Sequence, residues 1–110
     1  MSIEQSNIVD FVTLDETSGD ALLTISDHLT WDENEGTHLE LLQSKLNAYL
    51  RFIESGELVR EFPHVREKNV VIDLVGKFPL SEQAKIFMEK AGGAIRDAGF
   101  RLQFKVHPSN

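Results

Sequence analysis

The sequence predicts an α+β fold of the two-layer sandwich type, ββαββαβ, with a mostly antiparallel five-stranded sheet and two helices on one face. Short stretches in which apolar and polar residues alternate are typical of half-buried strands. Two longer stretches repeat apolar residues at the three- and four-residue spacing of amphipathic helices. Turn-forming Gly, Pro, Asp and Ser separate these stretches. At 110 residues, we expect one domain spanning residues 1–110.

The first two strands are predicted over residues 8–14 and 21–26. Both are largely apolar, and the residues between them are Asp, Glu, Thr, Ser, Gly and Asp, a composition typical of turns. Strands joined by so short a turn pair with each other, so we expect an antiparallel hairpin.

The longer helix is predicted over residues 37–55. Its apolar stripe consists of Leu39, Leu42, Leu46, Tyr49, Leu50 and Ile53. Other apolar residues widen this stripe, which indicates burial against a broad surface such as a sheet. We expect Asn34 or Thr37 to cap the start of the helix, and Gly56 to take up the left-handed conformation after its end.

The second half of the chain is predicted to repeat this order. Residues 57–62 are interpreted as a short strand, and residues 69–78 as the most strongly predicted strand of the chain. A helix then begins after Ser81, a favourable cap, and ends at Gly99. Residues 100–106 alternate apolar and polar side chains, as in a strand with one face in the core and one in water.

Two features interrupt these patterns. Gly92 and Gly93 lie inside the second helix, where each costs about 1 kcal/mol relative to alanine. We interpret them as positions of close packing against the sheet or the first helix; the alternative is a kink or break beside a ligand. Asp10 and Asp73 interrupt apolar strands, and we expect their side chains on the open face of the sheet, as surface carboxylates or as part of a polar site.

Acidic residues are concentrated at the start of the chain. The first 44 residues contain ten Asp or Glu and no Lys or Arg, whereas the remaining 66 contain eight acidic and all eleven basic residues, for a net charge of −7. A surface of one sign repels nucleic acid and attracts cationic partners. The basic residues are scattered among acids rather than arranged in a stripe, so we expect no binding to nucleic acid.

Other absences in the sequence narrow the classes of protein further. No apolar run approaches the roughly 20 residues that span a bilayer, and the N-terminal residues lack the features of a signal peptide. We therefore expect a cytoplasmic location and no membrane association. The chain has no cysteine, which excludes disulfides, thiolate catalysis and cysteine-ligated zinc.

Residues 27–38 are the best candidate for a functional segment, because they hold two histidines, four acidic residues and the only tryptophan. One interpretation is structural: acidic residues precede a helix, and Trp31 covers the end of the core. A second is a partner-binding loop with Trp31 as an exposed anchor among Asp32, Glu33 and Glu35. A third is a site for a metal or small ligand; its residues are His28, Asp32, Glu35 and His38.

The metal interpretation lacks a ligand template. His28 and His38 are ten residues apart, not four apart on one helix face as in a zinc protease. We therefore predict no metal and no cofactor. Asp27 and His28 form the only adjacent acid–histidine pair, but neighbouring strand residues point to opposite faces, and no serine lies in a nucleophile-elbow sequence. We predict no catalytic residues.

Two segments of the chain carry a resemblance to known sequences. These are residues 25–32, Ile-Ser-Asp-His-Leu-Thr-Trp-Asp, and residues 38–56, which begin His-Leu-Glu-Leu-Leu-Gln. The sequence resembles a bacterial family of small uncharacterised domains, and the likeness extends from the first strand to Phe104. The resemblance implies a bacterial cytosolic protein and brings no established activity, substrate or site residue.

These observations favour a non-enzymatic binding domain, similar in principle to inhibitor or immunity proteins, that engages a basic protein through its acidic first half. The alternative is a small-ligand or metal-dependent enzyme that uses the four residues of the third interpretation. A third hypothesis is a homodimer formed through the open sheet face or the edge strands.

Overall fold

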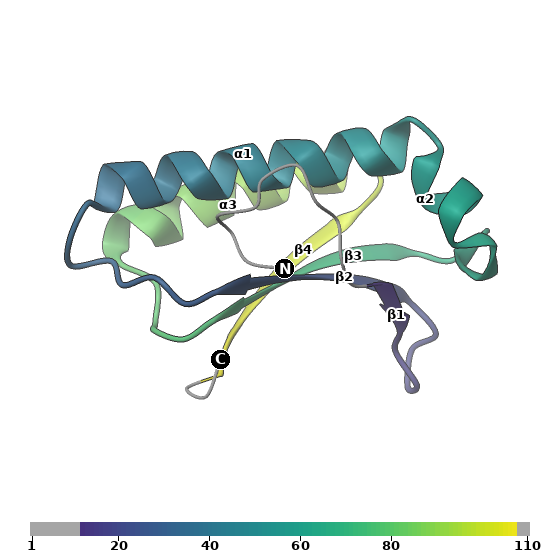
Figure 1. The fold of residues 1–110 in the computed structure, drawn as a ribbon, viewed down its shortest axis with the longest axis horizontal. Helices are drawn as coiled ribbons and strands as arrows, with labels where there is room; N and C mark the ends of the chain where they lie inside the picture. The colour runs from purple at the N-terminus through teal and green to yellow at the C-terminus, as the bar shows by residue number, and fades with distance from the viewer. Residues whose placement is uncertain (1–11, 108–110) are drawn as a thin grey trace.

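A computed structural model describes residues 12–107 (Figure 1). Its elements are β1 (Val12–Leu14), β2 (Ala21–Asp27), α1 (Glu35–Glu54), α2 (Glu57–Glu61), a 3-10 turn (Pro63–Val65), β3 (Val70–Gly76), α3 (Glu82–Asp97) and β4 (Arg101–Val106). The strands form one sheet in the order β1-β2-β3-β4. Helices α1 and α3 lie over the same face of this sheet, which confirms the α+β class with helices on one side (Figure 1).

The prediction of a mostly antiparallel sheet is wrong. Only β1 and β2 pair antiparallel, whereas β2 pairs parallel with β3, and β3 with β4. Each long helix is therefore a crossover that returns the chain to the end of the sheet from which the next parallel strand starts. The carboxyl ends of β2 and β3 consequently lie at the same end of the sheet, and α1 also starts at this end.

The five-stranded order ββαββαβ is wrong because residues 57–61 form the short helix α2. Five residues are too few to separate a two-residue period from a helical one. In the helix, Leu58 is buried and Phe62 accompanies it one turn later, with the Phe62 amide donating to the Leu58 carbonyl at 2.8 Å. Gly56 has φ +88°, as predicted, and this left-handed residue separates α1 from α2.

The predicted first strand is described only in part. Residues 12–14 pair with β2, and residues 8–11, including Asp10, lie outside the described residues. No helix within residues 12–107 combines the length and the apolar character needed to cross a membrane.

The hydrophobic core lies between the helices and the sheet. Leu23, Ile72 and Leu102 stand opposite one another on β2, β3 and β4, and the first two are fully buried. Helix α1 covers this face with the buried Leu42, Leu46 and Tyr49 of the predicted apolar stripe. The Tyr49 hydroxyl donates to the carbonyl of Thr24 at 2.9 Å, which fixes α1 over β2.

On the opposite face, basic side chains of β4 reach across β3. Arg101 stands opposite Val71, and its guanidinium lies 3.3 Å from Asp20, so its side chain extends over β3 toward the start of β2; Val71 is accordingly buried.

Asp73 lies on this open face, as predicted, but its carboxylate is only 2% exposed. Gln103 donates to it at 3.1 Å, and Lys105 forms an ion pair with it at 3.1 Å. The acid is therefore satisfied by its own sheet, which is the structural interpretation of this residue.

The prediction that Gly92 and Gly93 mark close packing is wrong. A Cβ atom at Gly92 would have no neighbour within 4 Å, and one at Gly93 would meet only the end of Arg96 at 4.0 Å. Helix α3 is nevertheless continuous from Glu82 to Asp97, so the glycines do not break it either. No contact within residues 12–107 requires glycine at either of these two positions.

Ser81 is the cap of α3 that the sequence predicts, since its Oγ accepts a hydrogen bond from the Ala84 amide at 3.1 Å. Replacing Ser81 with alanine is expected to lower the free energy of unfolding by about 1 kcal/mol, because one amide of the first turn loses its acceptor. Urea denaturation measures this difference. Ser44→Ala, at an exposed position within α1, is the matched control, and equal losses in the two variants would contradict the capping role.

Candidate functional site

The candidate site is the loop between β2 and α1, residues 28–34, which we call the β2–α1 loop. The residue before the loop is Asp27, the last residue of β2, and its side chain is buried. Asp27 Oδ1 accepts a hydrogen bond from the Leu29 amide at 3.1 Å, and its carbonyl accepts one from the Lys77 amide at 2.8 Å. The first turn of the loop is thereby tied to the carboxyl ends of β2 and β3.

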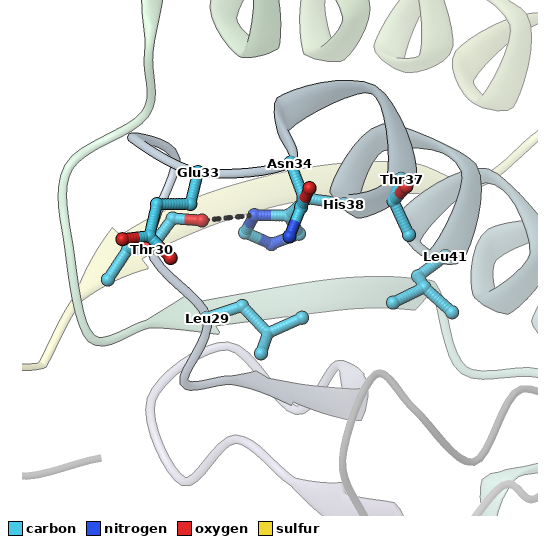
Figure 2. Close-up of a pocket in the computed structure, with 7 residues that line it drawn as sticks. All are labelled: Leu29, Thr30, Glu33, Asn34, Thr37, His38 and Leu41. Carbon is cyan, nitrogen blue, oxygen red and sulfur yellow. Dashed lines mark hydrogen bonds between the residues drawn. The ribbon is translucent and has the colours of Figure 1, made fainter.

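His38, one turn into α1, holds the loop from the helix side. Its Nε2 lies 2.6 Å from Asp27 Oδ2, and its Nδ1 lies 3.0 Å from the carbonyl oxygen of Thr30 (Figure 2). A carbonyl oxygen only accepts, so Nδ1 donates to Thr30, while Nε2 faces the Asp27 carboxyl group. Since protein atoms occupy both ring nitrogens, His38 acts in this arrangement as a buried structural bridge.

Trp31 closes this arrangement from the other side. Its indole stacks on the His38 ring with the ring centroids 3.5 Å apart and the planes 13° from parallel, and it is 8% exposed. The expectation that Trp31 is an exposed anchor is therefore wrong. The indole covers His38 and the end of the core because the loop is pulled inward by the bonds to Asp27 and Thr30.

The acidic side chains of the segment are placed differently. Asp32 and Glu33 are exposed and Glu35 is half-exposed, and within residues 12–107 none of the three forms an ion pair. They follow directly on the buried Trp31 and lie at the start of α1. Three of the four residues predicted for partner binding are thus accessible to solvent, carried by a loop whose interior side is fixed.

The start of α1 departs from the predicted capping. The helix begins at Glu35, and Asn34 stands at its N-cap position with φ +53° and no hydrogen bond from its side chain. Such a conformation is uncommon for residues other than glycine and is tolerated best by Asn and Asp. The bonds of Thr30 and His38 on either side hold Asn34 in this conformation.

A pocket of about 290 Å³ lies beside the loop, as Figure 2 shows. Leu29 and Leu41 supply its apolar walls, and the edge of His38 lies between them. Its remaining lining is polar and consists of Thr30, Glu33, Asn34 and Thr37. The pocket therefore combines an apolar floor with one acidic side chain and no basic one.

The alternative site predicted from the sequence does not come together as a ligand set. His38 is engaged with Asp27 rather than with Asp32 or Glu35, and His28 lies exposed on the loop. Within residues 12–107 no group of three or more His, Asp or Glu side chains is arranged to hold a metal ion. The separation of Asp27 from His28, one buried and one exposed, is as predicted.

Sequence reasoning missed the Asp27–His38 pair. A signal for it exists in the spacing, because His38 lies four residues before Leu42 and so continues the buried stripe of α1 by one turn. Extending the stripe to a polar residue would have required a buried partner, and Asp27, the acid at the end of the buried strand β2, is such a partner.

The model of a family of unknown function, DUF6572, matches residues 1–108. The chain belongs to DUF6572. Membership of DUF6572 confirms the resemblance to an uncharacterised domain that residues 25–32 and 38–56 indicate. A search of curated proteins found no match, and a search of solved structures found none.

Proposed function

We propose that this DUF6572 chain is a non-enzymatic binding domain that engages a basic protein surface through the β2–α1 loop. The observation that carries the proposal is the combination of free carboxylates and a fixed backbone at Asp32, Glu33 and Glu35. These side chains have no cation to neutralise them within residues 12–107. A partner with a complementary positive surface would associate with the loop faster and more specifically.

The rigidity of the loop supports the proposal as strongly as its charge. Binding costs less free energy when the contact groups are already ordered, because fewer side-chain and backbone motions are lost. Asp27, His38 and Trp31 hold the loop through two hydrogen bonds to the imidazole and one stacked ring contact. Trp31 has a different role from the one expected, since it orders the surface from below.

A second candidate function is the binding of a small ligand in the pocket next to the loop. The feature that favours it is position, because parallel sheets covered by helices commonly bind ligands beyond the carboxyl ends of their strands. Leu29 and Leu41 would contact an apolar part of the ligand, and Glu33 would pair with a cationic group. Such a ligand would carry a positive charge, as the surface of the proposed protein partner does.

Neutralising the loop tests the first proposal. In the triple variant Asp32→Asn, Glu33→Gln, Glu35→Gln, we expect loss of binding to a basic protein that wild-type chain captures from lysate, with at least about a tenfold rise in Kd for that protein in titration calorimetry. Because the pairing is electrostatic at an exposed surface, we also expect Kd to rise with salt concentration.

The control variant changes the same number of charges elsewhere. Glu54→Gln, Glu57→Gln, Glu61→Gln neutralises three exposed acids outside the loop and should retain the partner. Equal capture of every protein by the loop variant and the wild type would contradict the proposal. Binding of small cationic ligands that is lost in Glu33→Gln, with no protein captured, would favour the second candidate.

A further inference from the structure

The outer edge of β4 is open in the described part of the chain. β4 ends the strand order, and it pairs only with β3. The His107 amide donates to the Gly76 carbonyl at 2.8 Å, so odd-numbered residues in this segment direct their backbone groups toward β3. The backbone groups of Leu102, Phe104 and Val106 consequently point outward, and exposed groups of this kind pair readily with another strand.

A groove of about 600 Å³ runs between this edge and α3. Its apolar floor comes from Met88, Phe100 and Leu102, and Gly92 and Gly93 form its wall on the helix. These glycines have no packing role inside the chain, yet they weaken the helix. Their missing side chains would allow the backbone of another molecule to come close at the middle of α3.

The charges on this side of α3 are arranged symmetrically about the two glycines. Glu89 and Arg96 both line the groove, both are exposed, and each is three residues from the nearer glycine. A two-fold axis between Gly92 and Gly93 places Glu89 of one copy opposite Arg96 of the other, and the reverse, giving two equivalent ion pairs. The surface is thus complementary to itself in charge.

We propose that a second copy of this chain occupies the groove, forming a two-fold homodimer in which β4 pairs antiparallel with β4 of the second copy and the two α3 helices cross at Gly92 and Gly93. Leu102 lies beside these glycines in the groove, so the same axis passes close to Leu102. The sheet then continues across both copies. The β2–α1 loop takes no part in this interface, so the dimer is independent of the proposed binding function.

A register centred on Leu102 is compatible with the charges of β4. It sets Arg101 opposite Gln103 of the second copy, two residues that differ in charge. Shifting the centre to Gln103 would set Arg101 opposite Lys105, and like charges directly opposite each other destabilise a strand pair. The position of the glycines therefore indicates an alignment that the charge pattern of the strand permits.

Variants that exchange the charges of Glu89 and Arg96 test the proposal. Sedimentation velocity over a range of protein concentrations measures the dissociation constant of the dimer. We expect wild-type chain to form a dimer, and Glu89→Arg and Arg96→Glu each to raise its dissociation constant about tenfold or more, because each change sets like charges opposite each other twice. The double variant Glu89→Arg, Arg96→Glu recreates the ion pairs with their ends exchanged. We expect it to dimerise within about threefold of the wild type.

Lys90→Glu, one residue from Glu89 but not part of the groove lining, makes the same charge change as Arg96→Glu and should leave the dissociation constant unchanged. Circular dichroism of each variant checks that α3 stays folded. A wild-type monomer at the highest concentration would overturn the proposal. A dimer that neither single exchange weakens, or that the double variant fails to restore, would overturn the interface.

Discussion

His38→Ala is expected to lower the free energy of unfolding by about 3–5 kcal/mol, because it removes a buried aromatic ring and one partner of a buried side-chain hydrogen bond. Among residues 12–107, the change leaves the Leu29 amide as the remaining hydrogen-bond donor to the buried Asp27 side chain. It also removes the ring on which Trp31 stacks, and so opens a cavity at the end of the core. Urea denaturation followed by circular dichroism measures the loss.

The partner variants show whether the two side chains act as a unit. Asp27→Ala should cost a similar amount, and the double variant should cost clearly less than the sum of the two, because neither residue is then left buried without its partner. His64→Ala, at an exposed histidine, should change stability by less than about 0.5 kcal/mol. Additive losses at Asp27 and His38 would show that the pair does not hold the loop.

Gly76→Ala is expected to cost about 1–3 kcal/mol, the usual range for inserting a group into a packed core. A Cβ atom on this residue of β3 would lie 2.9 Å from the Phe104 ring and 3.2 Å from the carbonyl oxygen of Phe78. The ring can turn aside only by leaving its place on the core face of β4, whereas the carbonyl belongs to the backbone that leaves the strand. Thermal or urea denaturation gives the difference.

Two further variants separate this clash from a general effect of alanine. Gly36→Ala places a methyl group in open space at the start of α1 and should be neutral or stabilising. Combining Gly76→Ala with Phe104→Leu should cost less than the two separate losses together, since the smaller side chain makes room for the methyl group. A stable Gly76→Ala protein would mean that β3 and β4 are not packed as described.

The sequence predicts elements best where one period extends over many residues. The stripe of α1 and the cap of α3 at Ser81 are confirmed, because a long helix repeats its signal several times and a cap has its own side-chain chemistry. Residues 57–61 offer one turn only, and the single helical repeat from Leu58 to Phe62 is too short to separate a helix from a short strand. That single misassigned element replaced the end of the crossover between β2 and β3 with a predicted second hairpin, so the parallel pairing of β2 with β3 was missed.

The site was harder to predict than the fold because its parts are far apart in the sequence. The acidic residues of the loop are visible in the composition, but the Asp27–His38 contact depends on how α1 lies over β2. Lys45 gives another example: it is fully buried within α1, its ammonium 5.4 Å from the centre of the Tyr49 ring, although lysine is almost never fully buried. Burial of polar side chains is decided by tertiary packing, which local patterns do not record.

Because the chain has a single tryptophan, its intrinsic fluorescence excited at the red edge of the absorption band arises from one known place. That indole lies flat against an imidazole at the base of the β2–α1 loop. Its emission wavelength and intensity therefore give an optical readout of whether the loop is seated or lifted, without any label. Occupancy of the loop by a partner can be followed in the same signal, in real time and at low protein concentration.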